Sequence, residues 1–150
     1  MPALTRSQLQ EFLTGGRHLM KLATLTDEGW PAVIPVWYQY ADGVFLVAGR
    51  RKAAWVENIR NDSRVSACID KSDPPYVRVL VEADAVIADN AWLGDWEPWA
   101  IRYRGQESGH RYYEETKNTP RALIRVTPRK ITTWGGAGWH PRYDEGARVI

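Results

Sequence analysis

The chain has 150 residues, of which 44% are hydrophobic and 25% are charged, so it can bury a core without disulfides or metals. Its 20 basic and 18 acidic residues leave a net charge of +2, which argues against a dedicated nucleic-acid binder. The single cysteine, Cys68, excludes an intramolecular disulfide, and neither a signal peptide nor an apolar run of about 20 residues is visible. We therefore expect one cytoplasmic domain over residues 1–150, without membrane or nucleic-acid partners.

The first third of the chain predicts a helix and three strands. Apolar residues at helical spacing predict the helix over residues 4–13, and a Gly-Gly pair follows it. Strands are predicted at residues 18–25, 30–40 and 44–49. Because Pro31 and Pro35 cannot donate to a ladder, the second strand must lie at an edge or bend at these points. Tight turns containing glycine join the strands into an antiparallel meander.

A second helix is predicted over residues 52–62, and two strongly patterned strands follow it. In residues 64–70, and again in residues 76–88, apolar and polar side chains alternate. Such alternation buries one face of a strand and leaves the other face wet or functional.

The last third of the chain changes character. Residues 89–119 are rich in Trp and Tyr and predict two short helices. Strands return at residues 121–128 and 130–134, and the Gly-rich tail from about 135 to 150 is expected to be irregular. Six or seven antiparallel strands with a few short helices favour a mainly β (α+β) fold, a small β-barrel with helical excursions.

The sequence offers little catalytic chemistry of its own. Its histidines, His18, His110 and His140, lie far apart, and no metal-binding spacing accompanies the lone cysteine. We therefore expect no metal. We find neither a nucleophile motif nor a phosphate loop, so we can name no catalytic residue. If the protein is an enzyme, a cofactor carries the chemistry.

Three cations stand between the third predicted strand and the second predicted helix, in the stretch AGRRKAAW. The positive end of the helix dipole repels Arg50, Arg51 and Lys52 unless an anion joins them. A phosphate there would meet backbone N–H groups and up to three cations. The other interpretation is that the side chains point into water or pair with surface acids, and the residues alone leave both open.

Two aromatic segments also suggest a ligand. The strand PVWYQY places Trp37 beside prolines that expose backbone, and residues 92–103 hold tryptophans at near-helical spacing. Packing in the core is at least as typical an explanation of the first pattern, and the second is more often core or subunit interface than a ligand cage, so they do not decide the matter.

The order of these elements resembles the pyridoxamine 5′-phosphate oxidase-like split β-barrel family over residues 4–134. Three motifs carry the resemblance: G-x-P-x-x-x-P-V-W at 29–37, R-K-x-A-W-x-x-N at 51–58 and N-D-x-R-V at 61–65. The resemblance implies a split barrel that forms a homodimer and binds flavin mononucleotide (FMN) or a deazaflavin coenzyme at the subunit interface.

The resemblance also implies roles for individual residues. Arg51 and Lys52, with Arg50 as a further candidate, would bind the cofactor phosphate. The ring would lie against Val36, Trp37, Val47, Ala48 and Gly49, with Trp55 as a wall and Trp134 supplied by the partner subunit. The chain departs from the family at Ala53, where many members have a hydroxyl, and at Trp55, where others have a lysine.

The resemblance therefore predicts an oxidoreductase that uses FMN or deazaflavin to transfer a hydride to or from a small organic substrate. Tyr38, Tyr103 and Arg102 are candidates for groups on the substrate side. The alternative is a non-catalytic protein on the same fold that binds or stores a flavin, haem or lipid-like ligand. The sequence leaves the choice between FMN and deazaflavin open.

Overall fold

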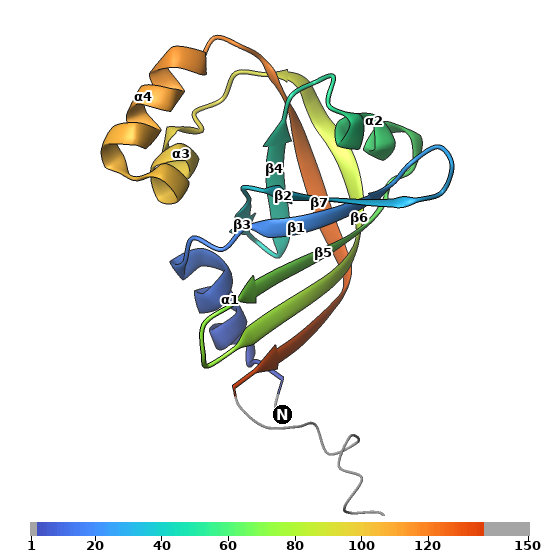
Figure 1. Ribbon diagram of the computed structural model, residues 1–150, viewed down its shortest axis with the longest axis vertical. Coiled ribbons are helices and arrows are strands. Elements are labelled where there is room, and N and C mark those ends of the chain that lie inside the picture. Colours follow the sequence, from blue (N-terminus) through green and yellow to red (C-terminus); the bar gives the residue numbers. More distant parts are fainter. Residues whose placement is uncertain (1–2, 137–150) are drawn as a thin grey trace, which may run out of the picture.

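The computed structural model describes residues 3–136, which form a seven-stranded antiparallel sheet in the order β2-β1-β5-β6-β7-β4-β3 (Figure 1). The strands are β1 (Met20–Leu25), β2 (Pro31–Val36), β3 (Gln39–Ala41), β4 (Val44–Gly49), β5 (Arg64–Lys71), β6 (Val77–Trp92) and β7 (Arg121–Gly135). The helices are α1 (Arg6–Gly15), α2 (Ala54–Asn61), α3 (Glu97–Arg104) and α4 (Gln106–Thr116). The sheet does not close, because β2 and β3 form its edges. The predicted mainly β, split-barrel class is confirmed.

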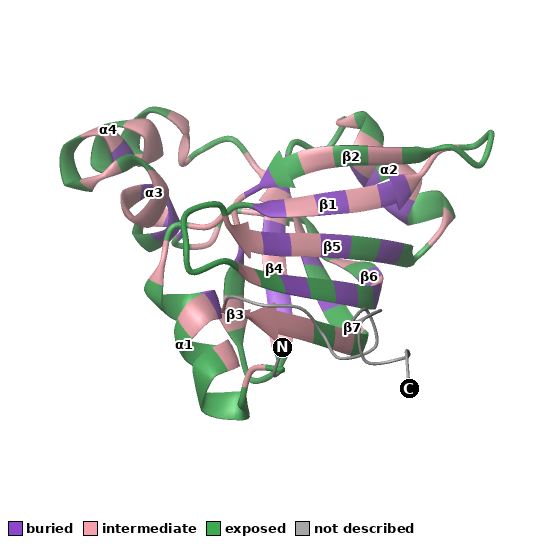
Figure 2. Cartoon of the chain, turned by 60° about the horizontal axis from the view of Figure 1, so that its bottom comes forward, coloured by how far each residue is buried: buried purple, intermediate pink, exposed green. Residues whose placement is uncertain are grey.

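The alternation predicted for β5 and β6 is present and builds the main core. Val79, Val81 and Ala83 of β6 are buried while their neighbours face outward, and Figure 2 shows the same stripes across the adjoining strands. Phe45 and Val47 of β4 belong to the same core and are fully buried.

The two strands predicted at 121–128 and 130–134 are one strand, β7. Its register against β6 shifts between Glu82, which faces Lys130, and Ala83, which faces Pro128. A bulge takes up the extra residue where proline cannot donate to the ladder, so the strand bends and continues. Gly135 ends β7, and the rest of the predicted tail, residues 137–150, lies outside the described residues.

The strand predicted at 30–40 is instead two strands, β2 and β3, separated at Trp37 and Tyr38. The Tyr38 ring turns into the core, where its hydroxyl donates to the Leu13 carbonyl at 2.8 Å. Side chains of α3 replace the ladder at this break: Tyr103 Oη lies 3.3 Å from the Tyr38 amide, and Arg102 donates to the Tyr38 carbonyl at 3.2 Å. The sequence alone did not reveal these distant partners.

Residues 93–120 leave the sheet and carry α3 and α4, which lie side by side outside it (Figure 1). Gly109 permits their close approach, since a Cβ there would lie 2.6 Å from the backbone of Ala100. Trp96 and Trp99 are buried against Leu123 of β7 and residues of β4. This aromatic excursion (residues 93–120) thus has a small core of its own. No helix within residues 3–136 is long and apolar enough to cross a membrane.

Candidate functional site

Two cavities meet where β4 ends and α2 begins. The first, of about 400 Å³, we call the aromatic slot; it is lined by Ile34, Pro35, Val36, Trp37, Ala48, Gly49, Ala53, Trp55, Trp96 and Trp99. The second, of about 650 Å³, we call the basic cavity; it is lined by Arg51, Lys52, Glu57, Arg60, Asn90, Thr116, Thr119 and Pro120. Both are also lined by Arg50, Tyr112 and Arg121, so the two spaces adjoin.

The slot begins at the end of β4, where Trp55 packs onto Gly49. A Cβ on Gly49 would lie 2.2 Å from the Trp55 ring, closer than any side chain allows. Only glycine therefore lets the indole lie against the strand at this point. Ala48 and Gly49 also line the slot, as does Val36 at the end of the edge strand β2.

The aromatic excursion supplies the opposite wall. Trp37 stacks on Tyr103 with ring centroids 5.3 Å apart and planes 3° from parallel, and meets Tyr112 edge-on at 5.9 Å. Trp96 in turn contacts Tyr112 edge-on at 5.4 Å. Trp37, Trp96 and Tyr112 thus pack in aromatic contacts and also line the slot, so the two interpretations of the aromatic segments are not exclusive.

The three cations lie in a turn before the helix rather than in its first turn. The predicted helix was to begin at Lys52, but α2 begins at Ala54, after a turn closed by the Ala53 amide donating to the Arg50 carbonyl at 3.0 Å. Ala53 is the N-cap residue and makes no side-chain cap hydrogen bond. The first amides of α2 are thus left without a capping side chain, next to the cations.

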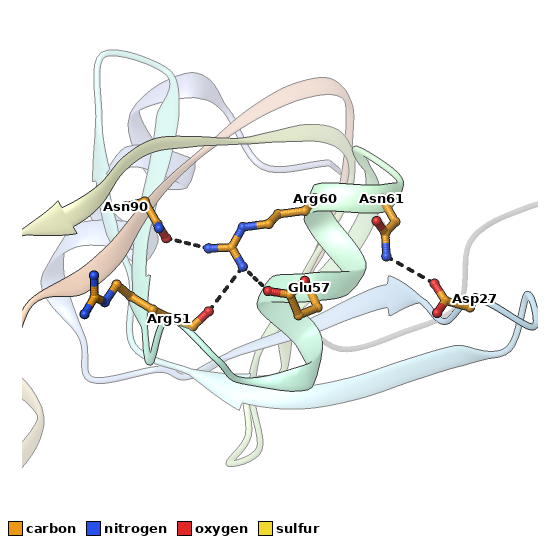
Figure 3. Close-up of polar contacts among 6 residues, drawn as sticks. All are labelled: Asp27, Arg51, Glu57, Arg60, Asn61 and Asn90. Carbon is orange, nitrogen blue, oxygen red and sulfur yellow. Dashed lines mark hydrogen bonds and ion pairs between the residues drawn. The ribbon is translucent and has the colours of Figure 1, made fainter.

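Arg60, which the sequence analysis did not single out, holds this turn in place (Figure 3). Its guanidinium donates to the Arg51 carbonyl at 3.2 Å and also bonds Glu57 and Asn90. It therefore ties the last turn of α2 to the cationic turn and to the end of β6. Its pairing with Glu57, three residues earlier on the helix, was the one signal in the sequence; the contacts with Arg51 and Asn90 arise from the fold.

Arg121, at the start of β7, was also missed, and it lies where the two cavities join. Its guanidinium carbon lies 4.4 Å from the centre of the Trp96 ring and 5.7 Å from that of Tyr112. Its Nη2 donates to Tyr112 Oη and to Thr116 Oγ1, each at 3.2 Å. Nothing in the sequence around Arg121 distinguishes it from a surface arginine of a strand.

Most of the charge around the basic cavity is not neutralised by the protein. Within residues 3–136, no carboxylate forms an ion pair with Arg50, Arg51, Lys52 or Arg121. Glu57 is the one acidic residue among the described lining residues, and it is paired with Arg60. In the described part of the chain, the three cations therefore do not pair with surface acids.

Two of the predicted site residues do not line either cavity. The Val47 side chain is fully buried in the main core. Trp134 lies near the far end of β7, with the Arg78 guanidinium 5.5 Å from its ring centre. A contribution of Trp134 to the partner's site stays a prediction.

The candidates for the substrate side have other partners. Burial raises the pKa of Tyr38 to about 12, and it also raises the pKa of Tyr103. Arg102 donates to the carbonyls of Gly16, Leu13 and Tyr38, which places it between α1 and the β2–β3 break. None of the three lines the aromatic slot or the basic cavity.

The described histidines also lie outside the cavities. His18 stacks on Phe12 and His110 pairs with Glu97, while His140 lies outside the described residues. No cluster of three or more potential metal ligands occurs within residues 3–136.

The family model described as pyridoxamine 5′-phosphate oxidase matches residues 5–135. The chain belongs to this family. Most of the described fold lies inside the match, including both cavities and all seven strands. No curated protein sequence matches the chain.

Solved structures show the same family fold. A conserved hypothetical protein of Mycobacterium tuberculosis has a TM-score of 0.72 at 22% identity, over 88% of this chain and 85% of its own. An FAD-binding protein of Mesorhizobium loti has a TM-score of 0.63 at 18% identity, over 91% and 97%. An F420 reductase has a TM-score of 0.62 at 22% identity, over 81% and 94%. The haem storage protein HutZ of Vibrio cholerae is also similar, with a TM-score of 0.62 at 18% identity over 87% and 94%.

Proposed function

We propose that the protein binds a flavin or deazaflavin coenzyme and uses it to transfer a hydride to or from a small organic substrate. The observation that carries this proposal is an aromatic slot that opens into a cavity where four of the five lining cations have no ion pair among the described residues. A planar ring joined to an anionic tail fits that pair of spaces. The proteins of similar fold include an FAD-binding protein and an F420 reductase, which supports the same class of ligand.

The residues of the slot and the cavity divide the task of binding. Trp37, Trp55 and the backbone of β4 would hold the ring, and buried Trp96 and Trp99 keep water from that side of the slot. Arg50, Arg51 and Lys52, with the uncapped amides of α2, would hold the first phosphate. The cofactor supplies the redox chemistry when it is bound, and the chain supplies orientation and charge.

A homodimer is part of this proposal, because the outer face of the sheet is incompletely covered. Val33 and Leu80 are 63% and 40% exposed, and together with Cys68 they line a hollow of about 490 Å³ on this face. A second copy would cover this apolar surface, and its Trp134 would then be available to the site. Sedimentation of the purified protein tests the dimer.

The second candidate function is a non-catalytic binder, for which the haem storage protein of similar fold is the argument. Haem iron is usually held by His, Cys, Met or Tyr. Of these residue types only Tyr112 occurs among the described lining residues of the two cavities. The absence of His, Cys and Met from that lining favours the flavin or deazaflavin over haem.

Titration of the purified protein with FMN and with the deazaflavin coenzyme tests the proposal. We expect tight binding of at least one, followed by reduction of the bound cofactor and reoxidation by an organic acceptor. Tight binding without turnover would support the storage function instead. If neither cofactor bound to the intact protein, the proposal would be wrong.

A further inference from the structure

We infer that Arg121 is a cofactor-binding residue that contacts a second anionic group, beyond the phosphate held by the cationic turn. The site would then select a cofactor whose tail carries a second anionic group over one that ends in a single phosphate. This inference rests on the proposed function and concerns the tail rather than the ring.

The size of the basic cavity is the first reason. At about 650 Å³ it is larger than the aromatic slot, and it lies within the range of roughly 300–1,000 Å³ typical of whole ligand sites. Its lining comes from the cationic turn, from Arg60 of α2, and from Arg121 of β7. A single phosphate at the turn would leave most of this space to other groups.

The charge of the cavity is the second reason. Five cations and one carboxylate are among its described lining residues, a net charge of +4. A phosphate monoester carries only about −1.5 to −2 at pH 7. Roughly two positive charges would stay uncompensated beside such a group, whereas a tail with a phosphodiester and several carboxylates would balance them.

The way in which Arg121 is held is the third reason. Two ring faces and two neutral hydroxyls fix its guanidinium, so it is positioned without being neutralised. Its Nε is buried without a partner among the described residues, and Nη1 makes no hydrogen bond within residues 3–136. An arginine held in this way at the junction of the two cavities is ready to accept an anion from the ligand.

Binding of probes that share a ring but differ in their tails tests the inference. One pair is the full deazaflavin coenzyme and the same coenzyme truncated after its phosphate; the other pair is FAD and FMN. We expect the wild-type protein to bind the member with more anionic groups at least about tenfold more tightly in one of the pairs. The deazaflavin pair would identify carboxylates as the second anion, and the flavin pair would identify a phosphate.

Arg121→Gln should abolish that preference, because it should weaken binding of the member with more anionic groups at least about tenfold more than binding of the single-phosphate member. Arg121→Lys, which keeps the charge but loses the planar fork, should retain part of the preference. Arg125→Gln is the matched control, because Arg125 is an exposed residue of the same strand that lines neither cavity. It should bind every probe as the wild type does.

Two results would overturn the inference without touching the proposed function. The wild-type protein would bind both members of each pair equally, or both Arg121 variants would weaken both members equally, as expected of a residue that only supports the fold. Failure of every ring-bearing probe to bind would instead reject the proposed function.

Discussion

The main core and the aromatic excursion are built from different residues and do different work. The main core is mostly aliphatic, and its buried residues alternate along β5 and β6, so its side chains interlock from strand to strand. The excursion joins tryptophans, tyrosines and arginines through ring stacking and cation–π contacts. The first arrangement determines the sheet, while the second supplies one wall of the aromatic slot and holds Arg121 of β7 where the slot joins the basic cavity.

The comparison shows that the regular sheet positions only some of the residues that line the two cavities. Ala48 and Gly49 follow from the sheet, because they end β4 and both line the slot. Tyr112 and Arg121 take their places through contacts across the excursion. Variation in this excursion can therefore change the ligand site while the sheet stays intact.

The largest effect is expected from Phe45→Ala, which empties a fully buried position of the main core. It should lower the free energy of unfolding by about 3–5 kcal/mol, measured by urea denaturation. Trp96→Ala should instead loosen residues 93–120 first, seen as faster amide hydrogen exchange there than in β5 and β6. Equal loss of protection in both regions for Trp96→Ala would contradict this division of the molecule.

Arg102→Gln is expected to have the next largest effect, because Arg102 ties α3 to α1 and to the β2–β3 break. Three carbonyls accept from its guanidinium, at 2.7, 3.0 and 3.2 Å, and glutamine, with two N–H donors on a shorter side chain, leaves at least one of them without its partner. We expect a loss of about 2–3 kcal/mol in the free energy of unfolding, measured by urea denaturation. Arg111→Gln, on the exposed face of α4, is the control and should change it by less than about 0.5 kcal/mol. A loss no larger than that of the control would show that these hydrogen bonds contribute little.

The sequence predicted the regular parts of the fold well, because alternation and turn residues are local signals. The buried faces of β5 and β6 and the position of the cationic cluster at the end of β4 could all be predicted in this way. What could not be predicted depends on partners far along the chain. Tyr103 breaks the predicted strand at Tyr38 across 65 residues, and Arg60 reaches Asn90 across 30.

The start of α2 shows a smaller error of the same kind. The predicted helix begins at Lys52, yet the Ala53 amide closes a turn first and the observed helix begins at Ala54. The distinction matters for the site, since cations in a turn can surround an anion that the helix amides also contact.

Substitutions in the cationic turn should weaken ligand binding and leave the free energy of unfolding nearly unchanged. Arg51→Ala combined with Lys52→Ala should weaken cofactor binding at least tenfold, about 1.4 kcal/mol, as measured by fluorescence titration. Both side chains are exposed and unpaired within the described residues, so the free energy of unfolding should change little. Arg6→Ala combined with Arg17→Ala removes the same charge from exposed positions outside the cavities and is the matched control. Unchanged affinity in the first variant would mean that the phosphate is bound elsewhere.

The smallest effect concerns His18, which lies where α1, β1 and Arg102 meet, between the two regions. Burial lowers its pKa, and the charges of Arg102, Lys21 and Lys71 lower it further, while Asp70 opposes them. Between the lowered pKa of the folded protein and the usual value of about 6.5, the unfolded chain binds more protons. Stability should therefore be complete above about pH 6.5 and should fall as the pH decreases through that value. His18→Gln should flatten this part of the dependence in urea denaturation at pH 7.5 and 5.5. If His18→Gln lost as much stability between those two pH values as the wild type does, the pH dependence would belong to other groups.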